Sequence, residues 1–381
     1  MREFIHGMDI SSMDEVVRLG GRFYNKGTEQ TLVNVLESYG VNYIRLRLWV
    51  DPYSEDGISY GGGGNDFPAT IRMIKEIKTA GLKYLLDFHY SDFWADPGKQ
   101  IKPKAWKDYD EEQLEKAVYE HTQSTLKRLK EDGLFPDMVQ IGNEITNGLL
   151  WPDGKKPAYD KITRFVNAGI RGVRAVDSDV QIMLHLDHGD DHEMCRDWFD
   201  HFRERGEEFQ IIGLSYYPVW NGAMKGLIDN MNLLARRYGK PMIVAEVSQP
   251  FTMEDYASYE GLAPEKRKGA AAKPALEKNL EYPATKEGQT LFMEKFMEEV
   301  AAVEDGLGIG YFYWEPAWLP VKGSGWATKE SLAYMQDSGP CGNEWANQGL
   351  FDYEGNALPA LEVVSRVALR KSKPLADGTE T

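Results

Sequence analysis

The sequence predicts a single (β/α)8 TIM barrel, a fold of the α/β class. Three observations favour it: eight short apolar segments recur along the 381 residues, helical patterns lie between them, and polar side chains follow most of the segments. A doubly wound open sheet is the alternative, but the chain contains neither a GxGxxG motif nor a P-loop. We expect the barrel to occupy residues 1–370, and we expect the polar tail 371–381 to be disordered.

The composition restricts the class of partner. With 42% hydrophobic and 27% charged residues, the chain is typical of a globular protein, and no apolar run approaches the roughly 18 residues of a membrane span. Its formal charge of −16 argues against nucleic acid and against polyanionic substrates, because both would be repelled. We therefore expect a neutral ligand, no membrane or nucleic-acid partner, and a monomer.

The start of the chain, MREFIHGMDIS, has no apolar signal-peptide core. We expect a cytoplasmic protein if Met1 is the native start. If a signal has been removed, we expect a secreted protein instead.

The barrel strands are expected where the apolar segments lie. Several of these segments are continuously apolar at their starts, as parallel strands buried on both faces are. The segments are FIHGMDIS (4–11), YIRLRLWV (43–50), YLLDFHYSD (84–92), MVQIGNEI (138–145), IMLHLDHG (182–189), IIGLSYYP (211–218), MIVAEVS (242–248) and IGYFYWEP (309–316).

Two of the intervening segments carry clear helix signals. Residues 66–81 place isoleucines along one stripe and end at Gly81, which suits the position after a helix C-terminus. Residues 110–133 begin with Asp110 three positions before Gln113, which is the spacing of a capping box. Strands that alternate with such helices predict a barrel rather than an antiparallel sheet.

Polar and aromatic residues gather at the C-terminal ends of the expected strands. In a barrel these ends form the mouth where active sites are built, so the pattern indicates a functional site there. The residues are Asp9, Arg45, Arg47, Asp87, His89, Asn143, Glu144, His185, Asp187, Tyr216, Tyr217, Glu246, Trp314 and Glu315.

Glu144 and Glu246 end the fourth and seventh strands and should face each other across the mouth. Glycoside hydrolysis needs two such carboxyls, and a separation of about 5–5.5 Å implies retention of configuration. An apolar setting would keep Glu144 protonated as the acid. The alternative is that both are ordinary strand-end glutamates bonded to neighbouring backbone or to arginine.

Arg45 and Arg47 strengthen the catalytic interpretation because they share one face of the second strand. An arginine beside Glu246 would keep that carboxylate ionised as a nucleophile. At least one of the two arginines could instead pair structurally with Asp9 or Asp87.

Tryptophans are unusually well placed for binding a sugar. Indole faces stack on the C–H faces of pyranose rings, so a row of tryptophans suits an oligosaccharide groove. Trp49 and Trp198 are expected in the core instead. The tryptophans at or just after strand ends are Trp94, Trp151, Trp220, Trp314, Trp318 and Trp326.

The segment HLDHGDDHEMC (185–195) resembles a metal site, since His188 and His192 are four residues apart. It is more simply explained as a solvated loop leading into a helix capped by Asp190 or Asp191. We expect no metal site here.

With these residues in place, the chain resembles glycoside hydrolase family 53, the endo-β-1,4-galactanases. The likeness runs from GMDIS (7–11) to FDYEGNALPAL (351–361), nearly the whole chain. The motifs that carry it are YIRLRLWVDPY, LLDFHYSDFWADPGKQ, MVQIGNEITNGLLWPDG, SYYPVWNG, YPATKEGQ, YFYWEPAW and NEWANQGLFDYEGNALP.

The resemblance implies a retaining (β/α)8 glycosidase with Glu144 as acid/base and Glu246 as nucleophile. It implies that Asn143 binds the sugar 2-hydroxyl, while Tyr217 and Arg45 hold the charge and orientation of the nucleophile. It further implies that Trp314 forms the floor of the cleaving subsite. His89, Trp94, Asp96, His185 and Asp187 fall on groove-lining motifs of the family, and Trp220 and Trp318 complete the expected substrate-binding set.

The implied substrate is the neutral β-1,4-linked galactan of type I rhamnogalacturonan and arabinogalactan side chains, or its oligosaccharides. No cofactor is implied. Some family members bind calcium near the mouth, but the segment 251–285 lacks an Asp-x-Asp-x-His-x-Asn cluster, so we expect no such ion. Val247 after Glu246 and Asn221 after Trp220 depart from the usual threonine and histidine, which puts subsite detail rather than the chemistry in question.

The sequence therefore predicts an endo-acting, retaining galactanase. A retaining hydrolase of another neutral β-1,4-glycan, such as mannan or glucan, is the enzymatic alternative, because groove curvature cannot be read from a sequence. A non-catalytic galactan-binding protein is the alternative from another class.

Overall fold

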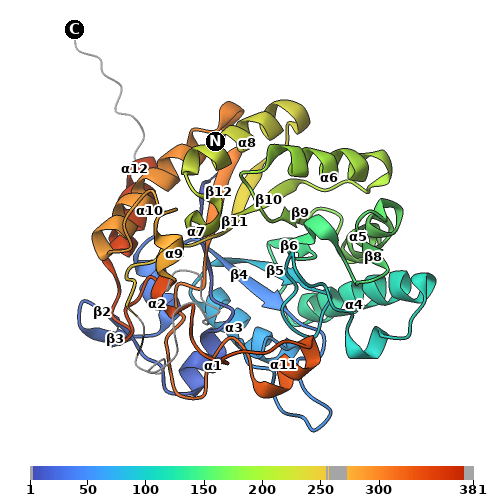
Figure 1. The fold of residues 1–381 in the computed structure, drawn as a ribbon, viewed down its shortest axis with the longest axis horizontal. Coiled ribbons are helices and arrows are strands. Elements are labelled where there is room, and N and C mark those ends of the chain that lie inside the picture. The colour runs from blue at the N-terminus through green and yellow to red at the C-terminus, as the bar shows by residue number, and fades with distance from the viewer. Residues whose placement is uncertain (1–2, 255, 257–272, 373–381) are drawn as a thin grey trace.

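The computed structural model describes residues 3–254, 256 and 273–372, and its centre is a closed barrel of parallel strands (Figure 1). Around the barrel the hydrogen-bonded order is β1, β12, β11, β10, β9, β6, β5 and β4, which closes on β1. All eight predicted strands are present, so the TIM barrel is confirmed and the open sheet is wrong. The strands are β1 (Ile5–Asp9), β4 (Tyr43–Leu48), β5 (Lys83–Phe88), β6 (Met138–Ile141), β9 (Gln181–Leu186), β10 (Ile211–Tyr216), β11 (Met242–Val247) and β12 (Gly308–Trp314).

Helices surround the barrel (Figure 1) and bury its outer surface. Both predictions about helix ends are confirmed: Gly81, with a φ of 77°, directly follows the C-cap residue Ala80 of α3, and the Asp110–Gln113 capping box starts α4. The helices are α1 (Met13–Arg18), α2 (Leu32–Ser38), α3 (Phe67–Thr79), α4 (Glu111–Glu131), α5 (Tyr159–Arg174), α6 (His192–Arg205), α7 (Pro218–Asn221), α8 (Met224–Tyr238), α9 (Pro274–Glu277), α10 (Lys286–Ala301), α11 (Lys329–Met335) and α12 (Pro359–Ser372).

Alternation along each strand divides the side chains between two cores. On β4, Tyr43 points into the barrel with Arg45, whereas Ile44 packs outward against the helices. A buried apolar floor fills the barrel interior and leaves only the mouth for polar groups. The floor consists of Ile5, Tyr43, Leu85, Met138, Met183, Ile211, Ile243, Ala245, Ile309 and Phe312.

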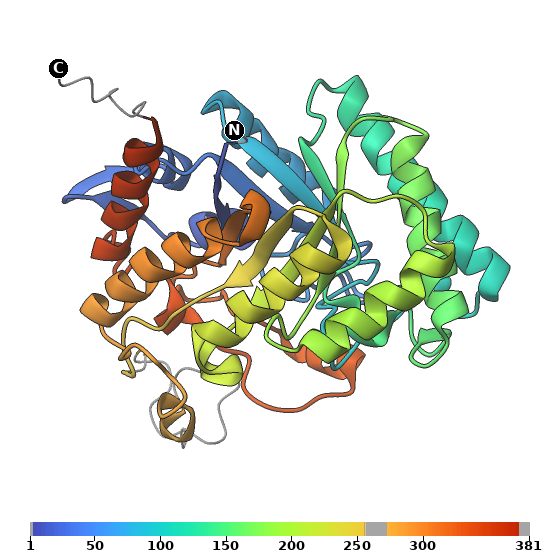
Figure 2. The same cartoon turned by 90° about the horizontal axis from the view of Figure 1, so that it is seen from above.

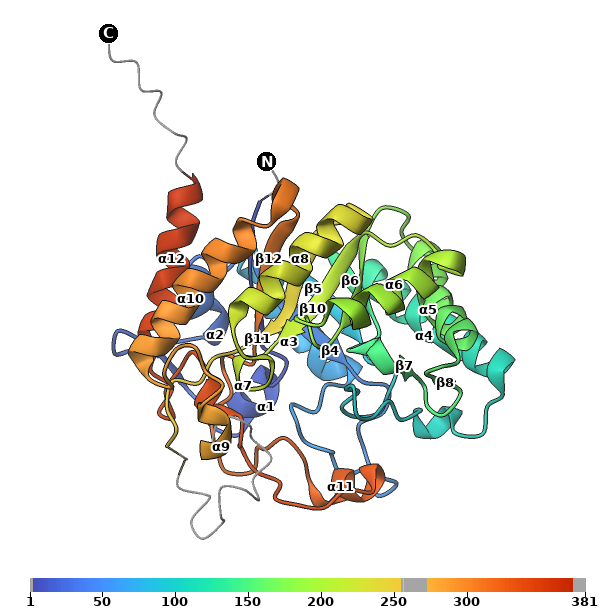
Figure 3. The same cartoon turned by 45° about the horizontal axis from the view of Figure 1, so that its top comes forward.

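The loops at the mouth carry structure that the sequence did not predict. Figure 3 shows α9 and α11 at the end of the barrel opposite the N-terminus. Two short hairpins, β2 (Phe23–Asn25) with β3 (Thr28–Gln30) and β7 (Gly148–Leu149) with β8 (Gly154–Lys155), lie outside the barrel sheet. These elements are short and lack the periodicity that identifies barrel strands.

The last described element, α12, lies beside α10 (Figures 1 and 2) and continues to Ser372. The tail 371–381 was expected to be disordered, but its first two residues, 371 and 372, belong to α12. Residues 373–381 lie outside the described part of the chain. Part of the expected linker at 261–279 also lies outside it. No helix among the described residues combines the length and apolarity needed to cross a bilayer.

Candidate active site

Glu144 lies just beyond β6 in an unusual backbone conformation. Its φ of 47° is left-handed, which costs a non-glycine residue on the order of 1–3 kcal/mol. Tyr90, His188 and Glu315 also have positive φ and also follow barrel strands. Backbone strain is thus repeated around the mouth, where functional residues are often held in such conformations.

Glu246 faces the mouth because β11 carries a bulge. The pairing of β10 with β11 shifts by one residue, so that Leu214 pairs with Val244 while Ser215 pairs with Glu246. Regular alternation after the inward-facing Ala245 would turn Glu246 toward the helices. The bulge instead aims the carboxylate inward, which is a common use of bulges beside active sites.

The two glutamates meet across the mouth as predicted. One carboxylate oxygen from each, together with a ring nitrogen of His185, lies within 4.8 Å of the others. This spacing is close to the roughly 5–5.5 Å between the carboxyl groups of retaining glycosidases, and it is well below the roughly 6.5–9.5 Å of inverting ones. The geometry favours direct attack of one carboxylate on a sugar.

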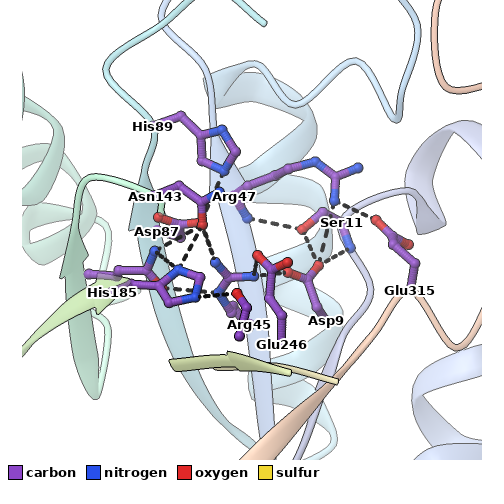
Figure 4. A network of polar contacts seen from close by, with 12 residues as sticks. Asp9, Ser11, Arg45, Arg47, Asp87, His89, Asn143, His185, Glu246 and Glu315 are labelled. Carbon is purple, nitrogen blue, oxygen red and sulfur yellow. Dashed lines mark hydrogen bonds and ion pairs between the residues drawn. The ribbon is translucent and has the colours of Figure 1, made fainter. Parts of the chain in front are cut away.

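Arg45 is the centre of a buried polar network that includes Glu246 (Figure 4). Its guanidinium contacts three carboxylates, so the expected contact with Glu246 and the alternative pairing with Asp9 and Asp87 both occur. The distances are 2.9 Å from Nη1 to Glu246 Oε1, 2.8 Å from Nη1 to Asp9 Oδ2, 2.8 Å from Nη2 to Asp87 Oδ2, 2.7 Å from Nη2 to Asn143 Oδ1 and 3.1 Å from Nε to Gln140 Oε1.

Opposing effects act on the pKa of Glu246. Burial raises this pKa above its usual value, while the Arg45 charge and the Tyr217 hydroxyl, which donates to Oε2 at 2.6 Å, act to lower it. Both carboxylate oxygens therefore have a donor. These donors stabilise the ionised form, as a nucleophile requires.

Among the residues that the structure describes, no cation forms an ion pair with Glu144. Burial, followed by repulsion from Glu246 and Asp187, raises the pKa of Glu144 well above its usual value. Because the paired carboxyls cannot both ionise easily, the proton of the pair resides on Glu144. The surroundings thus suit Glu144 to proton donation and Glu246 to attack.

Arg47 does not contact Glu246. Its guanidinium donates to Glu315 Oε1 at 2.5 Å and to the Gly62 carbonyl at 2.6 Å, and it lies 4.2 Å from the ring centroid of Trp94. Arg47 therefore holds an aromatic wall rather than the nucleophile. The role of Glu315 was not predicted, although it follows a strand end.

Aromatic side chains form the walls of the cleft above the glutamates, which encloses about 550 Å³. Trp314 lies between Tyr217 and Trp345, with ring centroids 6.2 and 5.7 Å away. Trp345 was not predicted, because it lies in a long loop after β12 rather than at a strand end. The tryptophans lining the cleft are Trp94, Trp220, Trp314, Trp326 and Trp345.

Two of the predicted tryptophans lie elsewhere. Trp318 is buried behind the wall, parallel to Trp94, and donates to Asn343 rather than lining the cleft. Its expected role in sugar binding is therefore indirect. Trp151 lies outside the cleft lining and carries the Lys155 ammonium over its ring. Trp49 and Trp198 are fully buried, as expected.

Most of the remaining predicted residues line the cleft, and one lies buried beneath it. His89, Asp96, Asp187 and Asn143 line the cleft. His185 is fully buried beneath them and contacts Asn143 and Ser215 instead. Among the residues that the prediction missed, Gln140 had a signal, since it is a polar side chain at an inward position of an apolar strand.

The i, i+4 pair of the segment 185–195, His188 and His192, bonds to different partners. His188 contacts Asp187 at 3.4 Å, whereas His192 bonds Asn230 at 3.0 Å. Asp191 caps α6, as expected. Within the described ranges, the metal-type side chains that converge are those of Glu144, His185 and Glu246. The expected absence of calcium at 251–285 concerns a segment that lies partly outside those ranges.

The chain is similar to known proteins over nearly its whole length. A family model described as glycosyl hydrolase family 53 matches residues 5–364. An endo-beta-1,4-galactanase of Bacillus subtilis is 35% identical over 381 residues, covering 95% of this chain and 85% of the relative.

Solved structures are similar as well. A family 53 catalytic domain from Ignisphaera aggregans superposes with a TM-score of 0.87 at 37% identity, covering 95% of both chains. A structure of fungal beta-1,4-galactanases gives a TM-score of 0.75 at 30% identity, covering 94% of this chain and 98% of the other.

Proposed function

The chain belongs to glycosyl hydrolase family 53 and is a glycoside hydrolase, and we propose that it cleaves internal β-1,4-galactosidic bonds of galactan with retention. The observation that carries the proposal is the facing pair Glu144 and Glu246 with their unequal surroundings. The names of the relatives supply the substrate class.

In the first step, a Glu246 oxygen attacks the anomeric carbon while Glu144 protonates the departing glycosidic oxygen. Arg45 and Tyr217 hold the attacking carboxylate in place through its two oxygens. The product is a glycosyl ester on Glu246, and the shortened chain leaves with the proton from Glu144.

In the second step, ionised Glu144 takes a proton from water, and the resulting hydroxide attacks the anomeric carbon. The ester bond to Glu246 breaks, so both carboxyl groups return to their starting states. Two inversions give net retention. The two carboxyl groups and water suffice for this reaction, so no cofactor is needed.

The cleft suits a neutral sugar chain. Trp94, Trp314 and Trp345 line the cleft with aromatic rings, while Asn143 and Asp187 place polar atoms beside them. The formal charge of −16 would repel an acidic backbone, whereas galactan side chains are uncharged.

A galactan-binding protein without catalysis is the alternative from another class. Binding alone would gain nothing from the left-handed Glu144 or from a carboxyl pair that shares one proton at the floor of the cleft. We therefore favour hydrolysis.

Release of reducing ends from galactan, mannan and cellulose tests the proposal. We expect release from galactan above the other two, and a loss of about 10⁴-fold or more in Glu246→Gln, because a nucleophile is removed. Glu287→Gln, an exposed glutamate of α10, is the matched control and should retain full activity. No release from galactan, or full activity of Glu246→Gln, would contradict the proposal.

A further inference from the structure

A chain of buried hydrogen bonds leads from Glu144 through Ser215 to His185. Ser215 Oγ lies 2.7 Å from Glu144 Oε1 and 2.8 Å from His185 Nε2. The three side chains come from the ends of three neighbouring strands, β6, β10 and β9, and are 8%, 2% and 0% exposed. Because a hydroxyl donates only one hydrogen, Ser215 can donate to one of these partners and must accept from the other.

The contacts of the other ring nitrogen of His185, Nδ1, determine which group donates in each of these hydrogen bonds. Nδ1 lies 3.0 Å from Asn143 Oδ1 and 3.2 Å from Gln140 Nε2. Arg45 fixes the orientation of both amides, because it donates to Asn143 Oδ1 and to Gln140 Oε1. The oxygen of Asn143 and the nitrogen of Gln140 must therefore face the ring.

The amide hydrogens of Gln140 already have acceptors. Its Nε2 donates to the Gly142 carbonyl at 2.9 Å and to Asn143 Oδ1 at 3.2 Å, which uses both hydrogens. The remaining arrangement places the ring proton on His185 Nδ1, where it donates to Asn143 Oδ1. Any other tautomer would set two lone pairs against each other at 3.0 Å.

The ring carries only that one proton. Burial, together with the charges of Arg45 and His89, lowers the pKa of His185 well below its usual value, so the imidazole is neutral. Nε2 is then an acceptor, and the Ser215 hydroxyl donates to it. The Ser215 oxygen consequently presents lone pairs to Glu144 Oε1, and their 2.7 Å separation requires a proton supplied by Glu144.

We propose that His185, held as its Nδ1–H tautomer, orients Ser215 as an acceptor for the carboxyl proton of Glu144 and so keeps the acid protonated at rest. This inference rests on the proposed function of Glu144. Ser215 and His185 are positioning residues. The leaving oxygen replaces Ser215 as the acceptor of the proton in the first step, and a proton taken from water restores the chain in the second.

Several other charges surround Glu144, and variants of Ser215 and His185 leave all of them in place. Differences between wild type and these variants therefore report on the hydrogen-bond chain itself. The titratable and charged groups around the chain are Glu246, Tyr217, Asp187, His188, Asp96, Lys99, Arg45 and His89.

The pH dependence of kcat/KM on galactan tests whether Glu144 donates its proton to Ser215. Ser215→Ala removes the acceptor of the Glu144 proton, and His185→Leu frees Ser215 to donate to the ionised carboxylate. Both changes should move the upper limb of the profile to lower pH, by about half to one unit, since a neutral hydrogen bond is lost. An upper limb that stays in place or moves to higher pH would overturn the inference.

Ser124→Ala, an exposed serine on α4, is the control and should leave the profile unchanged. The thermal unfolding midpoint of each variant verifies that it is folded.

A comparison of leaving groups separates acid positioning from general damage. Galactan needs a proton on its leaving oxygen, whereas a dinitrophenyl galactobioside does not. Ser215→Ala should therefore lose about tenfold or more on galactan and much less on the aryl substrate. Equal losses on the two substrates would contradict a role in positioning the acid.

A measurement independent of activity reads the tautomer directly. Long-range ¹H–¹⁵N NMR of the wild-type imidazoles, with His185→Leu to assign the signal, should show His185 protonated on Nδ1. A proton on Nε2 would overturn the inference. If the wild type released no sugar from galactan, the proposed function would fail, and this spectrum would still decide the direction of the hydrogen bonds.

Discussion

Glu144 and Glu246 are chemically identical side chains to which the fold gives opposite tasks. Glu246 receives the Arg45 guanidinium and the Tyr217 hydroxyl, both of which stabilise its charge. Glu144 is buried and is repelled by neighbouring carboxylates, and both effects raise its pKa. This division between a nucleophile and an acid arises from partners on other strands.

Tyr217→Phe tests the support of the nucleophile. The change deletes the 2.6 Å bond to Glu246 Oε2, a bond to a charged group worth about 1.5–3 kcal/mol, so kcat should fall about 10- to 100-fold. Steady-state kinetics on galactan measure the loss. Tyr216→Phe is the matched control, because that hydroxyl bonds the Gly222 carbonyl, and kcat should stay near wild type. Equal losses in both variants would exclude a specific role for Tyr217.

Trp220→Ala tests the sugar-stacking interpretation at the rim of the cleft. The indole is 48% exposed and packs edge-on against Tyr217 and Trp345, so a sugar can cover its free face. Loss of about 1 kcal/mol of apolar contact should raise KM for galactan about fivefold and leave kcat nearly unchanged. Leu233→Ala, an exposed apolar residue of α8, should change neither constant. An unchanged KM in Trp220→Ala would show that this ring binds no sugar.

At the residue scale, the sequence predicted the groups that stand at strand ends. Glu144, Glu246, Arg45 and Asn143 could be placed because barrel topology brings strand ends together. Trp345 could not, since its loop is long and its path over the mouth depends on tertiary packing. Trp318 was placed in the groove because its spacing from the strand end does not show which side of the wall it occupies.

At the element scale, periodicity was sufficient for the barrel strands and for α3 and α4. The bulge in β11 could not be predicted, because MIVAEV is apolar apart from Glu246 and contains no glycine or other residue that would indicate a bulge. Glu246 reaches the mouth only through that bulge, so the prediction of its position was right although the register that produces it was not foreseen.

Asp110→Ala tests the capping box of α4. The Asp110 side chain accepts from the Gln113 backbone N–H, and the Gln113 side chain accepts from the Asp110 backbone N–H. Loss of the cap should reduce the free energy of unfolding by about 1 kcal/mol, as measured by urea denaturation. Asp108→Ala, an exposed aspartate two residues earlier, should change the stability little. A loss as large in Asp108→Ala would contradict the assignment of the cap.

At the scale of the whole molecule, Glu344 makes stability depend on pH. It is 2% exposed, and among the described residues no side chain donates to its carboxylate, while the backbone of Gly342 and Glu344 acts only to lower its pKa. Burial raises the pKa of Glu344 to about 7. Between its unfolded pKa of about 4.5 and 7 the folded state binds the extra proton, so the free energy of unfolding falls as pH rises through this window.

Glu344→Gln should remove this effect. Relative to wild type, the variant should gain about 1–2 kcal/mol in free energy of unfolding at pH 8, where the wild-type carboxyl is ionised, and little at pH 4.5, where it is protonated. Urea denaturation at both pH values measures the difference. A gain that is equal at the two values would show that the Glu344 charge is not its source.

The anomeric configuration of the first product tests most directly whether the facing glutamates act by double displacement. Proton NMR during early hydrolysis of galactan should show new reducing ends as the β-anomer, before mutarotation produces the α-anomer. This result follows from attack by Glu246, whose carboxylate lies closer to Glu144 than the roughly 6.5–9.5 Å separation that inverting enzymes use to place a water beside the sugar. An α-anomer formed first would contradict the role of Glu246 as nucleophile.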